Sequence, residues 1–135
     1  REGDKKTPIG KFRLENLYFR ADKIKKPQTQ LKCITIRKNM GWCNDVKSKK
    51  FYNKLISTKK RVRHEKLFRK DFKYNLLIPL SYNSNPTILG NGSAIFLHLT
   101  KNYKATAGCI ALKEKDFLIL LKLINKKTRI HISKI

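Results

Sequence analysis

The sequence predicts a single α+β domain, residues 1–135, that is mostly β: two packed mixed sheets with one buried helix near the C-terminus. The apolar segments 74–82 and 93–99 are typical of strands, and residues 128–132 alternate between polar and apolar side chains as a final strand does. The segment 114–124 has a helical period, with apolar residues at positions 117, 118, 120, 121, 123 and 124. Strand and helix signals do not alternate along the chain, which argues against a doubly wound parallel sheet.

The first half of the chain carries weaker signals. The Thr7-Pro8-Ile9-Gly10 turn is followed by alternation through Leu14, which predicts a short strand. Residues 21–32 predict a loop or a weak edge strand, and the β-branched stretch 33–37 predicts a strand. Residues 39–66 are rich in Asn, Gly, Asp and Lys, so we expect a long surface loop that packs its aromatic residues onto the core. These aromatic residues are Trp42, Phe51 and Tyr52.

Turn and end signals delimit the elements of the second half. Pro79 predicts an edge position or a bulge for the segment 74–82, because proline has no N–H to donate to a ladder. Gly90-Asn91-Gly92 predicts a flexible entry into the strand at 93–99. The helix is expected to end at Asn125-Lys126-Lys127, where the cations suit the negative end of the helix dipole.

The charge of the chain narrows the classes of partner. Lys and Arg number 33 against 9 Asp and Glu, a formal net charge of +24, and Lys outnumbers Arg 25 to 8. The candidate partners are nucleic acid, an anionic membrane surface and an anionic cell-wall polymer, and a solvated basic surface without a partner is an equal alternative. Because base-edge recognition favours Arg, sequence-specific nucleic-acid binding is disfavoured. The longest apolar runs are far shorter than the roughly 18 residues of a membrane span.

The three cysteines, Cys33, Cys43 and Cys109, are too few by one for a closed disulfide framework. Cys33 and Cys43 either pair or remain free thiols. The chain has no CxxC or HxxxH pattern, and we expect neither a metal nor a cofactor.

Cys109 and His98 are the strongest candidates for chemistry. His98 ends the predicted strand at 93–99, and a hairpin-like gap at 99–105 would return Cys109 to it. A thiol needs such an imidazole to act as a nucleophile near neutral pH. Gly108 permits a sharp turn, and the N–H groups beside it could face an oxyanion. The alternative is a buried structural cysteine and an unrelated histidine.

The other two histidines and the aromatic residues of the first half are weaker candidates. His131 is expected to be a surface or half-buried residue of the final strand, and His64 a solvated loop residue paired with Glu65. Trp42 and Tyr52 are expected to fill the core rather than to bind a ligand.

These motifs together resemble the L,D-transpeptidase catalytic domain (YkuD domain). The run Gly92–His98 followed by Thr106–Leu112 is similar to a compact subgroup whose nucleophile motif reads T-x-G-C-[IV]-A-L. The resemblance covers nearly the whole chain. It extends to R-E-G-D at 1–4, T-P-I-G at 7–10, G-W-C-N-D at 41–45, F-Y-N at 51–53, His64-Glu65, Tyr74 and Tyr82-Asn83. Domains of this family usually have strands before the R-E-G-D turn, so we expect the chain to lack its N-terminal strands.

The resemblance implies a cysteine enzyme that acts on peptidoglycan. Cys109 would attack the carbonyl of the third stem-peptide residue, usually meso-diaminopimelate, and release D-Ala. An amine would then take the acyl group to form a 3–3 cross-link or a protein attachment. His98 would be the general base, oriented by the backbone carbonyl of Leu99. The N–H groups of Gly108 and Cys109 would hold the oxyanion, and Thr106 would support the loop.

The resemblance also implies partners and a location. The expected partners are peptidoglycan stem peptides and an anionic cell-wall polymer. We expect the protein to be a monomer and to be located in the periplasm or cell envelope of a bacterium. Trp42, His64, Tyr82 and Asn83 become candidate substrate-binding residues.

Two departures from the larger family keep alternatives open. Ala107 stands where most members have His, and Ala111 stands where Arg or Asn often contacts substrate. One alternative is an L,D-carboxypeptidase or peptidoglycan hydrolase that uses water at the same site. An alternative of another class is a non-catalytic, basic nucleic-acid-binding domain.

Overall fold

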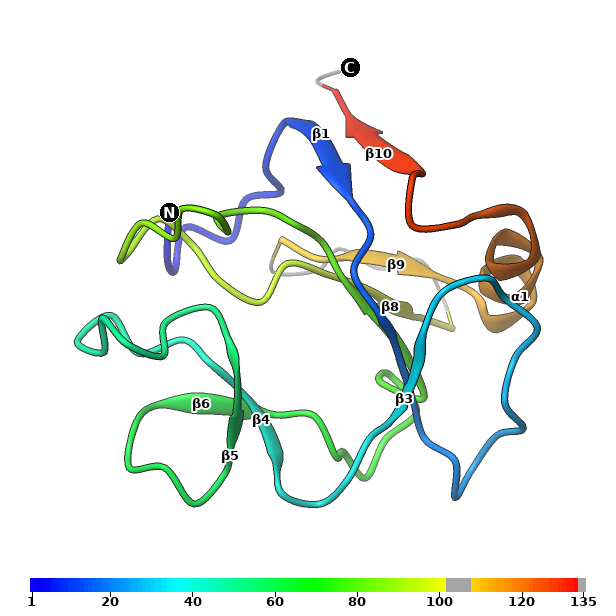
Figure 1. Ribbon diagram of the computed structural model, residues 1–135, viewed down its shortest axis with the longest axis horizontal. Helices are drawn as coiled ribbons and strands as arrows, with labels where there is room; N and C mark the ends of the chain where they lie inside the picture. Colours follow the sequence, from blue (N-terminus) through cyan, green and yellow to red (C-terminus); the bar gives the residue numbers. More distant parts are fainter. Residues whose placement is uncertain (102–107, 134–135) are drawn as a thin grey trace.

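The computed structural model describes residues 1–101 and 108–133; residues 102–107 and 134–135 lie outside the described part. Within that part the mostly β fold class with one helix near the C-terminus is confirmed (Figure 1). The strands form a two-stranded, a five-stranded and a three-stranded sheet rather than the two sheets expected. The elements are β1 (Gly10–Arg13), β2 (Leu17–Phe19), β3 (Cys33–Thr35), β4 (Met40–Cys43), β5 (Leu55–Ser57), β6 (His64–Lys66), β7 (Leu76–Pro79), β8 (Phe96–Leu99), β9 (Ile110–Leu112), α1 (Glu114–Leu123) and β10 (Arg129–Ile132).

The five-stranded sheet has the order β3-β2-β7-β8-β9. Its inner pairs, β2–β7 and β7–β8, are antiparallel, whereas the outer pairs, β2–β3 and β8–β9, are parallel. The prediction of an edge strand or bulge at Pro79 is therefore wrong, since β7 is the central strand. Pro79 is tolerated because it is the last residue of β7, where a missing N–H interrupts the fewest ladder bonds.

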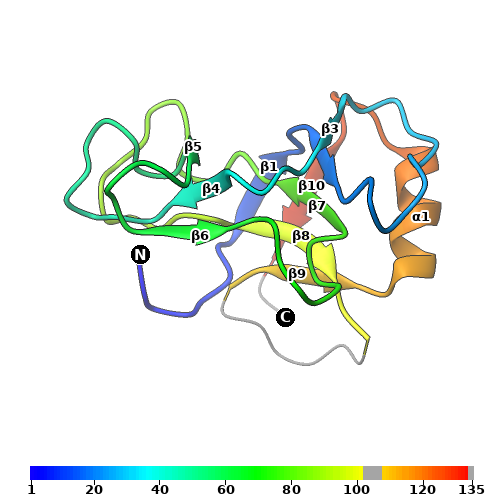
Figure 2. The same ribbon diagram turned by 90° about the horizontal axis from the view of Figure 1, so that it is seen from below.

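Successive residues of this sheet point to opposite faces, and the two faces contact different parts of the fold. We call the face that packs against α1 the helix face, and the face that packs against the three-stranded sheet the aromatic face. The helix face buries Leu76, Ile78, Leu97 and Leu99 against Phe117 and Leu121. The aromatic face buries Tyr18, Leu77 and Phe96 against Leu67 and the partly buried Trp42. Figure 2 shows α1 and the three-stranded sheet at opposite ends of the molecule.

Helix α1 follows the predicted segment closely but is buried on one side only. Phe117 and Leu121 are fully buried, whereas Ile119 and Leu123 are 50% and 76% exposed. Glu114 lies in the first turn, where its charge suits the positive end of the helix dipole. The expectation of a largely buried helix is corrected accordingly. Within the described residues no helix has the length and apolarity to cross a membrane.

Residues 39–66 are not the plain surface loop that was expected. They contain the three-stranded antiparallel sheet, in the order β5-β4-β6. Trp42 and Tyr52 pack inward as predicted: Trp42 meets Phe96 edge to face at 5.3 Å between ring centroids, and Tyr52 is fully buried. The segment therefore covers the aromatic face of the central sheet.

The remaining strands differ from the predictions mainly in length. The strand expected at 93–99 begins only at Phe96, because Ala94 has a positive φ of 55°. Strand β1 pairs with the C-terminal β10, on which His131 is exposed as expected. All three cysteines are free thiols, so Cys33 and Cys43 do not pair.

Candidate active site

His98 and Cys109 lie on neighbouring strands of the central sheet. The pair β8–β9 is parallel, with Leu97 opposite Ile110 and His98 opposite Ala111. Cys109 directly precedes β9 and therefore lies beside Phe96, on the aromatic face that His98 also faces. The predicted hairpin is wrong, since a hairpin would make the strands antiparallel. Residues 102–105 of the predicted gap lie outside the described residues.

His98 is held in one tautomer by its own strand. The residue is 6% exposed, and its Nδ1 lies 2.9 Å from the Leu99 carbonyl oxygen. Because a carbonyl oxygen can only accept, Nδ1 carries the proton and Nε2 is left as the acceptor. Burial lowers the pKa of His98 below its usual 6.5, the Leu99 contact opposes this shift, and the Lys73 charge reinforces it. The imidazole is therefore neutral at pH 7.

The Cys109 thiol is also neutral in this arrangement. Its Sγ donates to the Ala94 carbonyl oxygen at 3.3 Å. Burial raises the pKa of Cys109 to about 11; the Phe96 backbone opposes the shift and the Glu65 charge reinforces it. With its pKa raised in this way, the thiol is neutral at pH 7 and must lose its proton as it reacts.

Gly108 occupies a place that no other residue fits well. Its φ is +102°, and a Cβ added there would lie 2.8 Å from the Lys6 carbonyl oxygen and 3.6 Å from Ile95 Cδ1. The N-terminal turn therefore packs directly against the backbone that precedes Cys109. Thr106 and Ala107 lie outside the described residues.

The N-terminal turn is fastened to the rest of the site by Glu2. The Tyr52 and Ser93 hydroxyls donate to Glu2 Oε1 at 2.7 and 2.6 Å. Between this turn and Tyr82, Gly92 and Ser93 lies a hollow of 270 Å³. Because its lining includes Lys6 and Ile95, this hollow adjoins Gly108 and could receive part of a substrate.

Asn53 links the three-stranded sheet to the nucleophile. Its Oδ1 accepts from Trp42 Nε1 at 2.9 Å and from the Ala94 N–H at 3.1 Å, and the Ala94 carbonyl is the acceptor of the Cys109 thiol. Asn53 Nδ2 also donates to the carbonyls of Tyr82 and Asn83. Sequence reasoning missed this role, for which the F-Y-N motif was the available signal.

Glu65 and Tyr74 form a second polar pair on the aromatic face. The Tyr74 hydroxyl donates to Glu65 Oε1, and the Tyr74 ring lies edge-on to the His98 imidazole at 5.7 Å between centroids. Burial raises the pKa of both Tyr74 and Glu65. For Glu65 the hydrogen bond from Tyr74 acts in the opposite direction and partly offsets this rise. Sequence reasoning had paired Glu65 with its neighbour His64 and missed the contact.

The four candidate substrate-binding residues do not converge on one place. Trp42 packs against Phe96. His64 is the first residue of β6, and its Nδ1 lies 2.9 Å from the Val62 carbonyl oxygen. Tyr82 lines the hollow beside Gly108, whereas the Asn83 side chain is occupied within the 83–92 turn by Ile88 and Gly92. Of the four, Tyr82 is the one that lines this hollow, with its hydroxyl donating to the Asn91 carbonyl.

Comparison with known protein families gives a match over nearly the whole chain. The family model of the YkuD domain, described as the L,D-transpeptidase catalytic domain, matches residues 1–132. No curated protein and no solved structure matches the chain significantly. Within the described residues, no group of three His, Cys, Asp or Glu side chains could hold a metal ion.

Proposed function

Because the chain belongs to the L,D-transpeptidase catalytic domain family, we propose that it is a peptidoglycan L,D-transpeptidase with Cys109 as its nucleophile. Cys109 Sγ attacks the carbonyl carbon of the third residue of a stem peptide, and the bond to the terminal D-Ala breaks. The thioester that results is attacked by an amine, which forms an amide and returns the thiol. The acceptor amine belongs to a second stem peptide or to a protein.

His98 moves the protons in this scheme. Its Nε2 takes the thiol proton as Sγ attacks and gives it to the leaving D-Ala amine. The observation that carries this proposal is the Nδ1 contact with the Leu99 carbonyl, which leaves Nε2 as the acceptor on the face shared with Cys109. The Leu99 carbonyl has the orienting role that a carboxylate has in other triads.

The backbone before the nucleophile supplies the oxyanion donors. The N–H groups of Gly108 and Cys109 stabilise the tetrahedral intermediate, a contribution that typically amounts to about 10²–10³-fold in rate for each donor. The close approach of Lys6 to Gly108 supports this role, because it restricts the backbone to one conformation. Tyr82 and the hollow beside Gly108 receive the donor peptide.

The proposed setting is the periplasm or cell envelope of a bacterium, with the protein acting as a monomer on peptidoglycan. A net charge of +24 suits an anionic polymer, since cell-wall polymers carry carboxylates and phosphates.

The proposal is tested with purified protein and disaccharide-tetrapeptide fragments of peptidoglycan, analysed by mass spectrometry. Transpeptidation gives cross-linked dimers and free D-Ala. Shortened stems without dimers would instead identify the L,D-carboxypeptidase alternative, with water as the acceptor. No change in the fragments would contradict both.

The nucleophile is tested separately with a carbapenem, an acyl donor that labels the thiol. We expect one adduct per chain that maps to Cys109 and is absent from Cys109→Ala. The matched control is Cys33→Ser, which removes another free thiol and should keep the adduct. An adduct on Cys43, or one that survives in Cys109→Ala, would overturn the assignment.

A further inference from the structure

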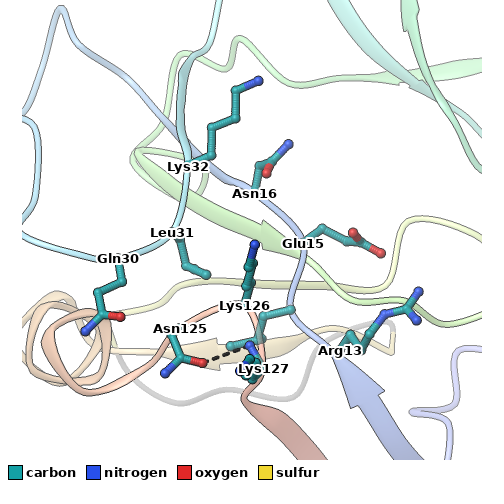
Figure 3. A pocket seen from close by; sticks show the side chains of 10 residues that line it. Arg13, Glu15, Asn16, Gln30, Leu31, Lys32, Asn125, Lys126 and Lys127 are labelled. Carbon is teal, nitrogen blue, oxygen red and sulfur yellow. Dashed lines mark hydrogen bonds between the residues drawn. The ribbon is translucent and has the colours of Figure 1, made fainter.

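A second concave site lies on the side of the molecule that carries the helix face. It is a hollow of 770 Å³, within the roughly 300–1,000 Å³ of ligand-binding sites. Its lining comes from three separate segments: the end of β1 with the residues after it, the residues before β3, and the connection between α1 and β10. We call this site the basic hollow (Figure 3); its lining residues are Arg13, Leu14, Glu15, Asn16, Gln30, Leu31, Lys32, Asn125, Lys126 and Lys127.

The basic hollow is remote from the candidate active site. Leu14 and Leu31 of its lining belong to the core on the helix face, whereas Cys109 packs with the core on the aromatic face. The central sheet separates the two. A ligand of the basic hollow would therefore not compete with a stem peptide at Cys109.

The cations of the basic hollow are free to meet a ligand. Four of the ten lining residues are Lys or Arg and one is acidic. Within the part of the chain that the structure describes, the side chains of Arg13, Lys32 and Lys126 make no hydrogen bond or ion pair, whereas Arg20 and Arg69 are each paired with an aspartate. In Figure 3 the Lys126 side chain extends between Leu31 and Glu15, and Glu15 lies toward the side of Arg13.

Three amide side chains give the basic hollow a second kind of chemistry. Asn16, Gln30 and Asn125 line it, and the described hydrogen bonds use only the oxygen of Asn125, which accepts from the Lys127 N–H at 2.8 Å. Free amides donate to and accept from hydroxyl groups. An acidic sugar carries both carboxylates, which the Lys and Arg side chains can bind, and hydroxyl groups, which the amides can bind.

The walls of the basic hollow are held in place before any ligand arrives. The Glu15 N–H donates to the Pro79 carbonyl and the Leu17 N–H to the Lys32 carbonyl, each at 2.9 Å. Asn125 and Thr128 close the third wall, with the Thr128 N–H donating to the Asn125 carbonyl at 3.0 Å. A preformed wall lowers the ordering cost of binding.

We propose that the basic hollow binds a segment of an acidic polysaccharide, whose carboxylates meet Arg13, Lys32 and Lys126 and whose hydroxyls meet the amides of Asn16 and Gln30. Nucleic acid fits less well, because single strands bind largely by stacking bases on aromatic side chains and none of the ten lining residues is aromatic. The site would hold a glycan strand on one side of the molecule while the other side acts on a peptide.

The test is calorimetric titration of the protein with a hexamer of galacturonic acid at about physiological ionic strength, where screening removes long-range attraction. Lys32→Gln with Lys126→Gln should weaken binding about tenfold. The matched control, Lys38→Gln with Lys49→Gln, removes the same charge from exposed positions outside the hollow and should change affinity less than about twofold. Equal losses in the two variants would overturn the proposal, because they would identify a diffuse basic surface.

A neutral variant separates a built site from simple charge attraction. Asn16→Ala with Gln30→Ala leaves the net charge unchanged and should still weaken binding about fivefold. An unchanged affinity would contradict the amide contacts. Equally tight binding of a thymidine oligonucleotide of equal charge would also overturn the proposal, in favour of a nucleic-acid site.

The folding of each variant is checked by its thermal midpoint, which substitutions at these surface positions should hardly move. No peptide substrate is present in these titrations. Failure here therefore leaves the proposed transpeptidase intact, and failure of that activity leaves this site intact.

Discussion

The helix face and the aromatic face of the central sheet share the same strands but differ in chemistry. On the helix face, Leu97 and Leu99 pack against Phe117 and Leu121, and the fully buried residues that the structure describes there are all Leu, Ile or Phe. On the aromatic face the residue between them, His98, lies beside Tyr74, and Cys109 packs near Phe96. One face is built for packing, and the other encloses groups that exchange protons.

The difference teaches how burial prepares the candidate site. Burial raises the pKa of Cys109, Tyr74 and Glu65 and lowers that of His98. Each shift favours the neutral form, because a low-dielectric environment penalises charge. The aromatic face therefore holds the Cys109 thiol and the His98 imidazole in their neutral forms before a substrate arrives.

The largest expected effect is the loss of the general base. His98→Ala should slow carbapenem acylation of Cys109 by about 10²–10⁴-fold, the usual contribution of a positioned base. The rate is measured by intact-mass spectrometry over time. His131→Ala, on the exposed face of β10, is the matched control and should acylate at the wild-type rate. Wild-type kinetics in His98→Ala would refute the division of roles between the faces.

The pH dependence sharpens the same contrast. The reactive form needs a neutral His98, so acylation should rise through a pKa below 6.5 and stay level until the thiol titrates near pH 11. A preformed thiolate–imidazolium pair would instead lose activity as the pH rises through neutrality.

The next-largest expected effect comes from Leu97, which precedes His98 in the sequence but lies on the helix face. Leu97→Ala removes a fully buried side chain and should lower the free energy of unfolding by about 2–5 kcal/mol. Acylation per folded molecule should remain within a few-fold of wild type. Urea denaturation gives the stability, and active-site titration gives the folded fraction. A rate loss as large as that of His98→Ala would show that the faces are not separable.

A smaller effect is expected where the N-terminal turn closes the aromatic face. Gly108→Ala combines a positive φ with a contact to the Lys6 carbonyl and should cost about 2–3 kcal/mol of stability. Gly90→Ala has a similar φ of +83° but no atom within 4 Å, so it should cost only about 1 kcal/mol. Denaturation of both variants isolates the contact. Equal costs would mean that the turn does not press on Gly108.

The smallest effect tests the buried polar pair. Tyr74→Phe removes the donor to Glu65 and should lower stability by about 1 kcal/mol at pH 8. Burial raises the pKa of Glu65 in the folded protein above 4.5, so its burial costs stability only above about pH 4.5, where the carboxyl is ionised in the unfolded chain. Loss of the Tyr74 hydrogen bond raises this pKa further, so in the variant the cost extends to higher pH. The loss should therefore be smaller at pH 5 than at pH 8. Tyr18→Phe, on the same face, is the control and should show no such pH dependence.

The sequence was sufficient for elements whose burial pattern is strong. The strand around His98 and the helix with Phe117 and Leu121 follow directly from apolar spacing. It was insufficient for the three-stranded sheet, because β6 is His64–Lys66, a segment without any apolar side chain. The prediction for Pro79 was wrong because the residue ends β7, where even in a central strand a missing N–H interrupts few ladder bonds.

The candidate site was predictable in its reacting groups but not in its supports. Cys109 and His98 stand out by residue type and spacing. Asn53 and Lys6 act through a side-chain oxygen and a backbone carbonyl that reach residues far along the chain. The F-Y-N motif marks Asn53 but not its distant partners, and no local pattern marks the contact of Lys6. The parallel pairing of β8 and β9 was equally hidden, since a short gap favours a hairpin.

The pairing of β1 with β10 has a consequence for how the molecule comes to exist. Gly10 meets Ile132 and Arg13 meets Arg129, so this two-stranded sheet joins segments more than a hundred residues apart. Among the strand pairs of the described residues, this pair closes the longest loop. The entropic cost of closing such a loop is compensated only late in folding, which is typical of proteins that fold slowly. During synthesis β1 therefore lacks its strand partner until β10 has emerged, and until then Phe12 has Tyr82 beside it but not Ile130 opposite it. The domain is thus most exposed to misassembly in the interval before β10 is made.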